Sequence, residues 1–412
     1  MQSFYIITLI TVMLLSCTNN PDKNEPPAEA TPSAYKQGSF GYDIAFLRQH
    51  DSIISLSVAG EPGQVVVSPR YQGKVFTSTA EGDEGKSFGW INYKAFSAPV
   101  DAHMNAYGGE NRFWLGPEGN RFSLYFKKDK DMVFDNWKTP AAFDTEPWTV
   151  VESKPSSVTM RKNMTLQNYA GAELRMEANR TIAILDKKEI AEKAGIMPAA
   201  DVKSVGYLAS NSITNRGQAA WDEKTGMPCI WMLDMFNPSE KTVIAIPYNT
   251  DVKDTTTKIA TTDYFGPIPT ARIRYHNGVL LFKADGKSRG KLGLTPLRAK
   301  NWAGSYDAGS QVLTLITYDL DPSGRYLNQE WNTKKPPFSG DAVNAYNDGP
   351  LEKGGQLGPF YELESVSPAA FLNPGGTLSH NHYVFHFMGP EKSLDQIATK
   401  VLGISLKELS EP

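Results

Sequence analysis

Short runs of alternating apolar and polar residues dominate the chain from about residue 50 onward. They are rich in Val, Ile, Leu and Thr and lie, for example, at residues 52–60, 63–69, 180–185, 241–248 and 311–320. A period of two is typical of strands that place one face on a core. Between two further runs stands Asn277–Gly278, a pair that predicts a tight hairpin. The pattern therefore predicts antiparallel sheets.

Helical patterns are few. Residues 186–195 begin with an Asp that can cap a helix and end on a Gly, and residues 393–403 begin with Ser393 in a capping-box pattern and also end on a Gly. Many strands with a few short helices predict an all-β fold, a large antiparallel β-sandwich.

The amino-terminal region differs from the rest. Residues 1–16 are apolar and uncharged, too few to span a bilayer comfortably, and Cys17 follows directly. This segment resembles the lipobox of Gram-negative lipoproteins, which implies a cleaved signal peptide, lipidation of Cys17 and an outer-membrane location. An ordinary signal peptide or a short anchor is the alternative. Residues 17–35 predict a flexible, proline-rich tether, and residues 36–412 predict a single domain.

Charge and cysteine content limit the kinds of partner and of disulfide bond that the chain can have. Lys and Arg number 42 against 45 Asp and Glu, for a net charge of −3, and they are interspersed. No basic stripe is present, so we expect no nucleic-acid partner. The two cysteines are Cys17 and Cys229. They offer no disulfide framework, and we expect Cys229 to be a small buried residue.

Three segments carry a family resemblance. They are "VVVSPRYQGKVFTSTAEG" (65–82), "YGGENRFWLGPEGNRFSLYF" (107–126) and the stretch 358–387, which contains "ELESVSP". Together they resemble the galactose mutarotase-like (aldose 1-epimerase-like) superfamily, in an uncharacterised branch of exported proteins. The resemblance implies a β-supersandwich fold and a mono- or oligosaccharide as partner. It implies no cofactor.

Glu362 and Glu364 are the first candidates for chemistry. Residues two apart in a strand share a face, so both carboxylates are expected on one side of the sheet. Mutual repulsion and burial would raise the pKa of at least one of them, which suits a general acid or base. The resemblance makes one of them the counterpart of the glutamate that deprotonates the anomeric hydroxyl. The alternative is a surface strand with two solvated acids.

Three histidines alternate with aromatic residues in "SHNHYVFHF" (379–387). His380, His382 and His386 share one face, which we expect to line a groove or to meet water. The connection from the glutamate strand is short enough for antiparallel neighbours, which would set Glu364 opposite residues 380–382. His382 could then transfer protons, the H-x-H pattern could bind Zn²⁺, or the histidines could be hydrogen-bonding residues at a strand edge. Of these alternatives, we do not predict the metal site.

Sugar binding needs further polar groups. Arg112 matches the Asn-Arg pair of the superfamily and could donate paired hydrogen bonds to neighbouring hydroxyls. The other candidates for substrate contacts are His103, Asn105, Lys291, His380 and His386. Trp114, Trp221 and Trp302 could stack on a pyranose ring or pack in the core.

The chain also departs from the superfamily. Its members take an acid/base histidine from a mid-chain segment, but no histidine occurs here between His103 and His276. Residues 210–236 offer asparagines and tryptophans instead. Two functions therefore stay open: a cell-envelope protein that binds a carbohydrate and acts on it through carboxylates, or a non-catalytic binding scaffold with the same fold.

Overall fold

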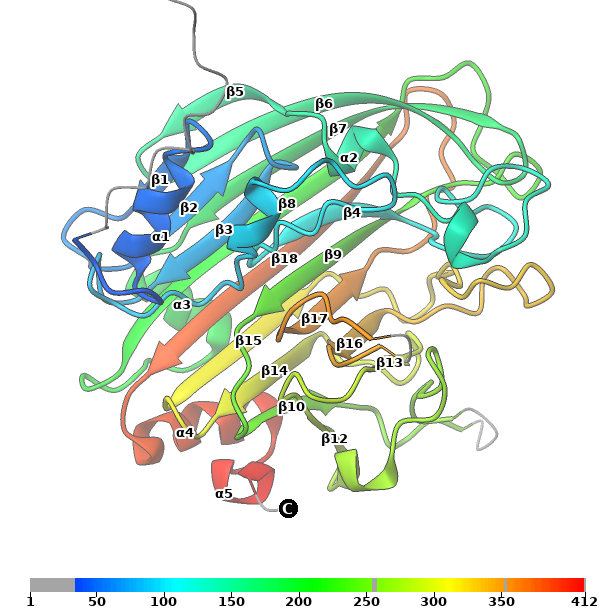
Figure 1. The fold of residues 1–412 in the computed structure, drawn as a ribbon. Helices are drawn as coiled ribbons and strands as arrows, with labels where there is room; N and C mark the ends of the chain where they lie inside the picture. The colour runs from blue at the N-terminus through cyan, green and yellow to red at the C-terminus, as the bar shows by residue number, and fades with distance from the viewer. Residues whose placement is uncertain (1–33, 254–257, 352–353, 411–412) are drawn as a thin grey trace, which may run out of the picture. The chain divides into compact units, whose positions relative to one another are not determined.

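The computed structural model describes residues 34–253, 258–351 and 354–410, and residues 35–412 group into one compact unit. Cys17 and the tether up to residue 33 lie outside the described residues. The described strands form three antiparallel sheets (Figure 1). Among the described residues, no helix has the length and hydrophobicity that crossing a membrane requires.

The largest sheet has ten strands. In spatial order they are β11 (Ile273–His276), β12 (Val279–Lys283), β10 (Thr242–Pro247), β14 (Trp302–Asp307), β15 (Val312–Tyr318), β18 (Thr377–Met388), β8 (Lys203–Asn215), β7 (Glu173–Ile184), β6 (Ser157–Gln167) and β5 (Thr149–Lys154). The predicted hairpin at Asn277–Gly278 joins β11 to β12, and both residues have positive φ. Such φ values are what a two-residue hairpin turn requires.

The second sheet, of five strands, carries the candidate carboxylates. Its spatial order is β13 (Gly290–Leu294), β16 (Val343–Asn347), β17 (Tyr361–Val366), β9 (Cys229–Phe236) and β4 (Arg112–Gly116). A three-stranded sheet, β1 (Ile54–Ser57), β2 (Gln64–Ser68) and β3 (Lys74–Thr79), packs against helix α1 (Phe40–Leu47).

The helices are short. They are α2 (Ala141–Asp144), α3 (Lys187–Ala194), α4 (Glu391–Leu402) and α5 (Leu406–Ser410), with 3₁₀ turns η1 (Tyr93–Phe96), η2 (Phe134–Asn136) and η3 (Thr270–Arg272). The predicted capping box of α3 is present. Helix α4 instead begins two residues before Ser393, which does not cap it, and ends at Gly403 as predicted.

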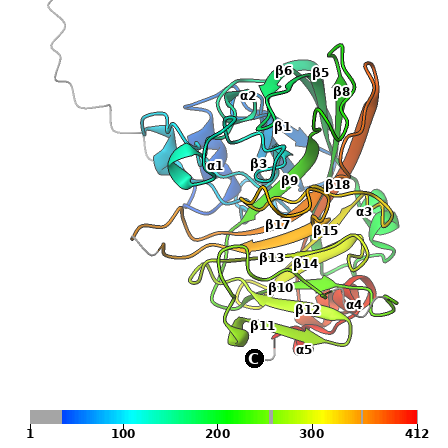
Figure 2. The same ribbon diagram turned by 90° about the vertical axis from the view of Figure 1, so that its right-hand side faces the viewer.

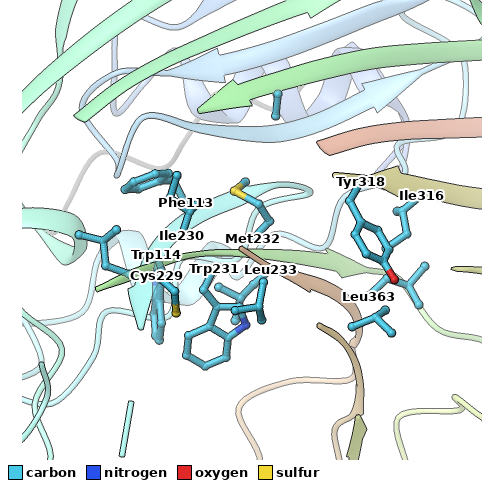
Figure 3. Packing of buried hydrophobic residues seen from close by; sticks show 14 of the residues in the cluster. Phe113, Trp114, Cys229, Ile230, Trp231, Met232, Leu233, Ile316, Tyr318 and Leu363 are labelled. Atoms are coloured by element: carbon cyan, nitrogen blue, oxygen red, sulfur yellow. The ribbon is translucent and has the colours of Figure 1, made fainter. Parts of the chain in front are cut away.

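The main core lies between the ten-stranded and five-stranded sheets. Leu363 and Met232 from the small sheet join Ile316 and Val384 from the large one in a single buried cluster. Figure 3 shows how β4 and β9 alternate: Phe113 and Met232 project from one side of the pair, and Trp114 and Trp231 from the other. The small sheet therefore has an inner face toward the large sheet and an outer face that carries Trp114 and Trp231.

A second core covers the opposite face of the ten-stranded sheet. Phe385 and Phe387 of β18 pack there with Leu394 and Ile397 of α4. Figure 2 places α3, α4 and α5 to one side of the large sheet and β13 and β17 to the other. Both faces of β18 are consequently buried, and the prediction that its histidine face meets a groove or water is wrong: His380, His382 and His386 are at most 1% exposed.

Candidate functional site

Strand β17 places Glu362 and Glu364 on the outer face of the five-stranded sheet. Leu363 between them packs in the core between the sheets, whereas both glutamates bond side chains from the two edge strands of their own sheet, Arg112 of β4 and Lys291 of β13. The shared face predicted from the sequence spacing is confirmed. Both residues are nevertheless buried, so they are not the solvated acids of a surface strand.

Glu364 is held by donors from strands on either side. Its Oε2 accepts hydrogen bonds from Lys291 Nζ of β13 at 2.8 Å and from Trp231 Nε1 of β9 at 2.8 Å. The Lys291 ammonium also lies 4.7 Å from the centroid of the Trp231 ring. The other carboxylate oxygen, Oε1, has no hydrogen-bond partner although it is buried. Glu364 therefore has one fixed oxygen and one buried oxygen without a hydrogen-bond partner.

Glu362 forms an ion pair with Arg112 of β4. The Arg112 guanidinium carbon lies 5.2 Å from the centroid of the Trp114 ring, so its partners are a carboxyl and an indole. Burial raises the pKa of Glu362 to about 8, with a further contribution from the charge of Glu364, and Arg112 acts in the opposite direction. Burial therefore favours the protonated form of Glu362, the form that a general acid needs, whereas the contact with Arg112 favours the carboxylate.

A third acid joins this face from the β16 side. Tyr264 donates its hydroxyl proton to Asp341 Oδ2 at 2.6 Å, and burial raises the pKa of Asp341 to about 6. Asn344 of β16 pairs with Glu364 across the ladder. Gly293 of β13 makes this packing possible, because a Cβ there would lie 2.2 Å from Asn344 Nδ2 and 2.3 Å from Asp341 Oδ2.

Four of the fifteen buried side-chain atoms without hydrogen-bond partners in the described residues belong to residues on or beside this outer face. Two are acceptors, Glu364 Oε1 and Asp341 Oδ1, and two are donors, Arg112 Nε and Trp114 Nε1. Leaving a buried polar atom unpaired costs about 1–3 kcal/mol, so these atoms are candidates for contacts with a ligand or with water. A polyhydroxyl compound suits this set because each hydroxyl both donates and accepts.

The predicted pairing of the histidine strand with the glutamate strand is wrong. Strand β17 pairs with β16 and β9, whereas β18 pairs with β15 and β8 in the other sheet. The connection that looked like a hairpin therefore crosses from one sheet to the other. His382 lies behind Glu364, on the inner face of β17, and contacts the neighbouring residue Ser365.

Inside the sandwich, His380 and His382 both lie 2.8 Å from Ser365 Oγ. His382 Nε2 lies 2.7 Å from Asp234 Oδ2. If Asp234 accepts the Nε2 proton of His382, then His382 Nδ1 accepts from Ser365, and Ser365 accepts from His380 Nε2. This order leaves His380 Nδ1 as a bare acceptor, and that atom has no partner. Burial lowers the pKa of His380 to about 3, so its ring is neutral.

His386 has an internal role as well. Its Nε2 lies 3.0 Å from Glu110 Oε1, its Nδ1 lies 2.8 Å from Thr314 Oγ1, and its ring stacks on Phe88 at 4.1 Å between centroids. None of these partners belongs to the outer face, so His380, His382 and His386 do not line one site with the glutamates. Within the described ranges, no group of three or more His, Cys, Asp or Glu residues could hold a metal ion.

His103 and Asn105 lie in the loop before β4. Asn105 donates its side-chain amide to Asp144 Oδ2 at 2.8 Å and to the Asp101 carbonyl at 3.0 Å, so both of its donors stabilise the loop. His103 Nδ1 donates to the Trp137 carbonyl at 2.6 Å. Of the predicted sugar-binding residues, only Arg112 and Lys291 therefore contact the glutamates.

The tryptophans predicted as stacking candidates separate into three environments. Trp114 lies beside Arg112 on the outer face, and Trp221 is buried in the main core. Trp302 lines a surface cavity of about 510 Å³ together with Lys300 and Tyr318. That cavity is formed by the ten-stranded sheet and α4 and contains neither glutamate.

Sequence reasoning missed Tyr264, Asp341 and Asn344. Tyr264 and Asp341 come from irregular segments, where no period marks the side that faces a site. Asn344 lies in "VNAYN" (343–347), whose alternation of polar and apolar residues was a usable strand signal.

The family model DUF6786, described as a family of unknown function, matches residues 38–412. The chain belongs to the DUF6786 family. No curated protein matches this DUF6786 chain.

Solved structures with a similar fold include three from bacteria. The Slr1438 protein of Synechocystis is 13% identical, with 82% of this chain and 96% of that one covered and a TM-score of 0.50. A galactose mutarotase-like protein of Lactobacillus casei is 10% identical, with coverage of 81% and 100% and a TM-score of 0.48. A galactose mutarotase related enzyme of Lactobacillus acidophilus is 10% identical, with coverage of 81% and 97% and a TM-score of 0.46. The predicted antiparallel β-sandwich fold is confirmed; at these identities the likeness to the solved structures concerns the fold alone.

Proposed function

We propose that this DUF6786 protein binds a carbohydrate on the outer face of the five-stranded sheet and transfers protons to and from it through Glu364 and Glu362. The observation that carries the proposal is the unpaired Oε1 of buried Glu364 on the same sheet face as the unpaired donors of Arg112 and Trp114. Indole rings and a few placed charged groups are what sugar hydroxyls and C–H faces need.

The two glutamates divide the chemistry of ring opening between them. Glu364 takes the proton of the anomeric hydroxyl on its free oxygen, while Lys291 and Trp231 hold the other oxygen in place. Glu362 gives its proton to the ring oxygen as the bond between that oxygen and the anomeric carbon breaks, which yields the open-chain aldehyde. Ring closure after rotation returns both protons. Glu362 in this way supplies the acid that the mid-chain segment lacks.

Polarimetry of freshly dissolved α-D-glucose and α-D-galactose tests this reaction. We expect the protein to speed the approach to anomeric equilibrium, and Glu364→Gln to lower the catalysed rate by roughly 10²–10⁴-fold, the usual contribution of a general base. Glu362→Gln should lower it as well. Glu240→Gln, a change at an exposed carboxylate in a surface ion pair, is the matched control and should leave the rate unchanged.

The second candidate is a binding scaffold without catalysis. It is favoured by the position of all three carboxy-terminal histidines inside the sandwich and by the ion pair that engages Glu362. Calorimetric binding of either sugar that weakens in Glu364→Gln, without any change in the rate of mutarotation, would support the scaffold. Neither binding nor turnover of these aldoses or their oligomers would exclude both candidates.

We also propose that the protein is an outer-membrane lipoprotein anchored at Cys17. The motivation is the apolar segment 1–16 directly before that cysteine. Radiolabelled palmitate should be incorporated into the protein expressed in a Gram-negative host and should be absent from Cys17→Ala. Equal labelling of the two forms would contradict the lipidation.

A further inference from the structure

An irregular loop, residues 261–268, lies against the edge of the five-stranded sheet that is nearest to Lys291. It leaves the sheet at Thr261, which pairs with Gly293 of the edge strand β13 through backbone hydrogen bonds of 2.8 and 2.9 Å. The backbone N–H groups of Gly266 and Ile268 bond carbonyls within the loop itself. The backbone therefore ties the loop to the sheet at Thr261, and side chains make its contacts with the outer face.

Tyr264 of this loop covers the polar groups next to Glu364. Its ring centroid lies 5.7 Å from Nζ of Lys291, the donor to Glu364 Oε2. Its hydroxyl donates to Asp341 Oδ2 at 2.6 Å and accepts from Asn344 Nδ2 at 3.4 Å. Asn344 is the residue opposite Glu364 in the ladder of β16 and β17. The loop thus contacts both a donor to Glu364 and its cross-strand partner, while Glu364 itself is 0% exposed.

Phe265 makes the corresponding contact beside Glu362. Its ring meets that of Tyr346 with centroids 6.0 Å apart, and the guanidinium carbon of Arg289 lies 3.8 Å from its centroid. Tyr346 is the residue opposite Glu362 in the same ladder. The two aromatic residues of the loop therefore lie on the cross-strand partners of the two glutamates.

The tip of the loop has few contacts that resist its displacement. Phe265 is 47% exposed, and Asp263, Gly266 and Pro267 are exposed as well. Gly266 has a φ of +91°, with open space where a Cβ would lie. Segments with little buried contact open locally at a small fraction of the free energy of global unfolding. The loop can therefore open while the sheet beneath it stays folded.

The Tyr264 hydroxyl occupies a position that suits a hydroxyl of a ligand. It donates to a carboxylate, Asp341, and accepts from an amide, Asn344. A sugar hydroxyl has one donor and two acceptor positions and can make the same two bonds. Exchange of one hydroxyl for the other leaves neither Asp341 Oδ2 nor Asn344 Nδ2 without a partner.

We propose that residues 261–268 form a lid on the carbohydrate site, and that a hydroxyl of the entering sugar replaces the Tyr264 hydroxyl at Asp341 and Asn344. This inference rests on the proposed function and specifies how a ligand reaches the buried Glu364. Tyr264 in this way competes with the sugar and is not one of its contacts.

Calorimetry with D-glucose and D-galactose tests this competition. Tyr264→Phe keeps the ring but removes the hydrogen bond that holds the lid closed, so more molecules are open and the apparent affinity rises. We expect the sugar that binds to bind roughly fivefold more tightly, the factor that one typical net hydrogen bond contributes. Tyr318→Phe removes a phenol that donates to the Lys300 carbonyl in the other sheet; it is the matched control and should leave the affinity unchanged.

Thiol labelling tests the opening of the lid without any sugar. In a Cys17→Ala background, Asn344→Cys places a thiol beneath Tyr264, and the buried Cys229 of β9 in the same sheet is the internal reference. We expect iodoacetamide to label position 344 at a rate that low urea concentrations leave unchanged, because local opening exposes little surface. Labelling of Cys229 should instead rise with urea. Adding Tyr264→Phe should speed labelling at position 344 roughly fivefold and leave Cys229 unchanged.

The outcomes separate the lid from the site. Weaker or unchanged sugar binding in Tyr264→Phe overturns the lid and leaves the carbohydrate site standing. An equal dependence on urea at both thiols also overturns it, because position 344 then becomes accessible by global unfolding. Failure of both sugars to bind the parent protein and Tyr264→Phe, with urea-independent labelling at position 344, overturns the proposed function and the entry of sugar under the loop.

Discussion

Strand β17 presents polar groups on both of its faces, but the two faces are organised differently. On the outer face, Glu362 and Glu364 bond side chains of their own sheet, and Glu364 keeps an unpaired oxygen. On the inner face, Ser365 joins two imidazoles that come from the other sheet. The inner groups bridge two sheets and are fully buried, whereas the outer ion pairs retain a slight solvent exposure.

The difference shows that burial of charged and polar groups has two separate uses in one strand. On the inner face the groups around Ser365 bond their neighbours, because a buried donor or acceptor without a partner is costly, and among them His380 Nδ1 alone has no partner. On the outer face several buried polar atoms have no hydrogen-bond partner, which is the arrangement expected where a ligand binds. Histidine content alone would have pointed to the wrong face.

Removal of the imidazole at position 382 should have the largest effect. His382→Leu leaves the Asp234 carboxylate buried with Asn111 as its remaining side-chain donor, and breaking a buried pair costs about 3–5 kcal/mol. Urea unfolding should show this loss in the free energy of unfolding. His276→Leu removes a half-buried histidine paired with Glu408 and should cost under about 1 kcal/mol. Similar losses in both variants would contradict the role of the inner face.

The outer face should make stability fall as pH rises. The folded protein keeps the proton of Glu362 up to a pKa of about 8, whereas the unfolded chain loses it near 4.5. Between these values the native state binds more protons, so the free energy of unfolding decreases with pH by at most ~1.4 kcal/mol per unit. We expect a total loss of about 2–4 kcal/mol between pH 5 and 8 in urea titrations. Glu362→Gln should flatten that slope. An unchanged slope would show that other titrating groups cause the decrease of the free energy of unfolding with pH.

Ser365→Ala tests the bridge between the sheets directly. Without the hydroxyl, His380 Nε2 and His382 Nδ1 lose a shared partner, which we expect to lower the free energy of unfolding by about 1–3 kcal/mol. Ser323→Ala, at an exposed serine bonded to Asp321, is the control and should change stability by under about 0.5 kcal/mol. A loss no greater than that of the control would mean that Ser365 is dispensable for stability.

The inner face should show the opposite pH dependence, with the smallest effect. His380 has a folded pKa of about 3 against 6.5 in its ordinary state. Below pH 6.5 the unfolded chain gains a proton that the native state refuses, so stability falls as pH falls. We expect about 1–2 kcal/mol of loss between pH 6.5 and 5. His380→Gln should reduce this loss relative to the parent protein; an identical acid slope in the variant would show that other groups cause it.

Sequence analysis predicted the fold and part of the site. Alternation placed Glu362 and Glu364 on one face, because the period of two is a local pattern that backbone geometry obeys. Arg112 was identified differently, by its match to the Asn-Arg pair of the superfamily that the chain resembles. The turn at Asn277–Gly278 was predictable for the same reason: its positive φ angles favour those residue types.

The position of the histidines could not be predicted in the same way. A short connection suggests neighbouring strands, but the period of two is the same whether β18 joins the sheet of β17 or the facing sheet. The deciding information is the long-range pairing of β18 with β8. Loop residues such as Tyr264 and Asp341 depend on that same three-dimensional assembly, so their place beside Lys291 had no local signal.

The pairing of β18 also governs the order in which this protein can be completed during synthesis. β18, near the carboxy terminus, inserts between β8 and β15 in the middle of the large sheet. Until it emerges from the ribosome, β8 and β15 have no contact with each other through the sheet, and Ser365 has no imidazole behind it. Long-range pairing of this kind is slow, so β8 and β15 each keep one unpaired edge in the middle of the sheet until β18 arrives. Strand β18 thus completes both the large sheet and the polar contacts behind Ser365.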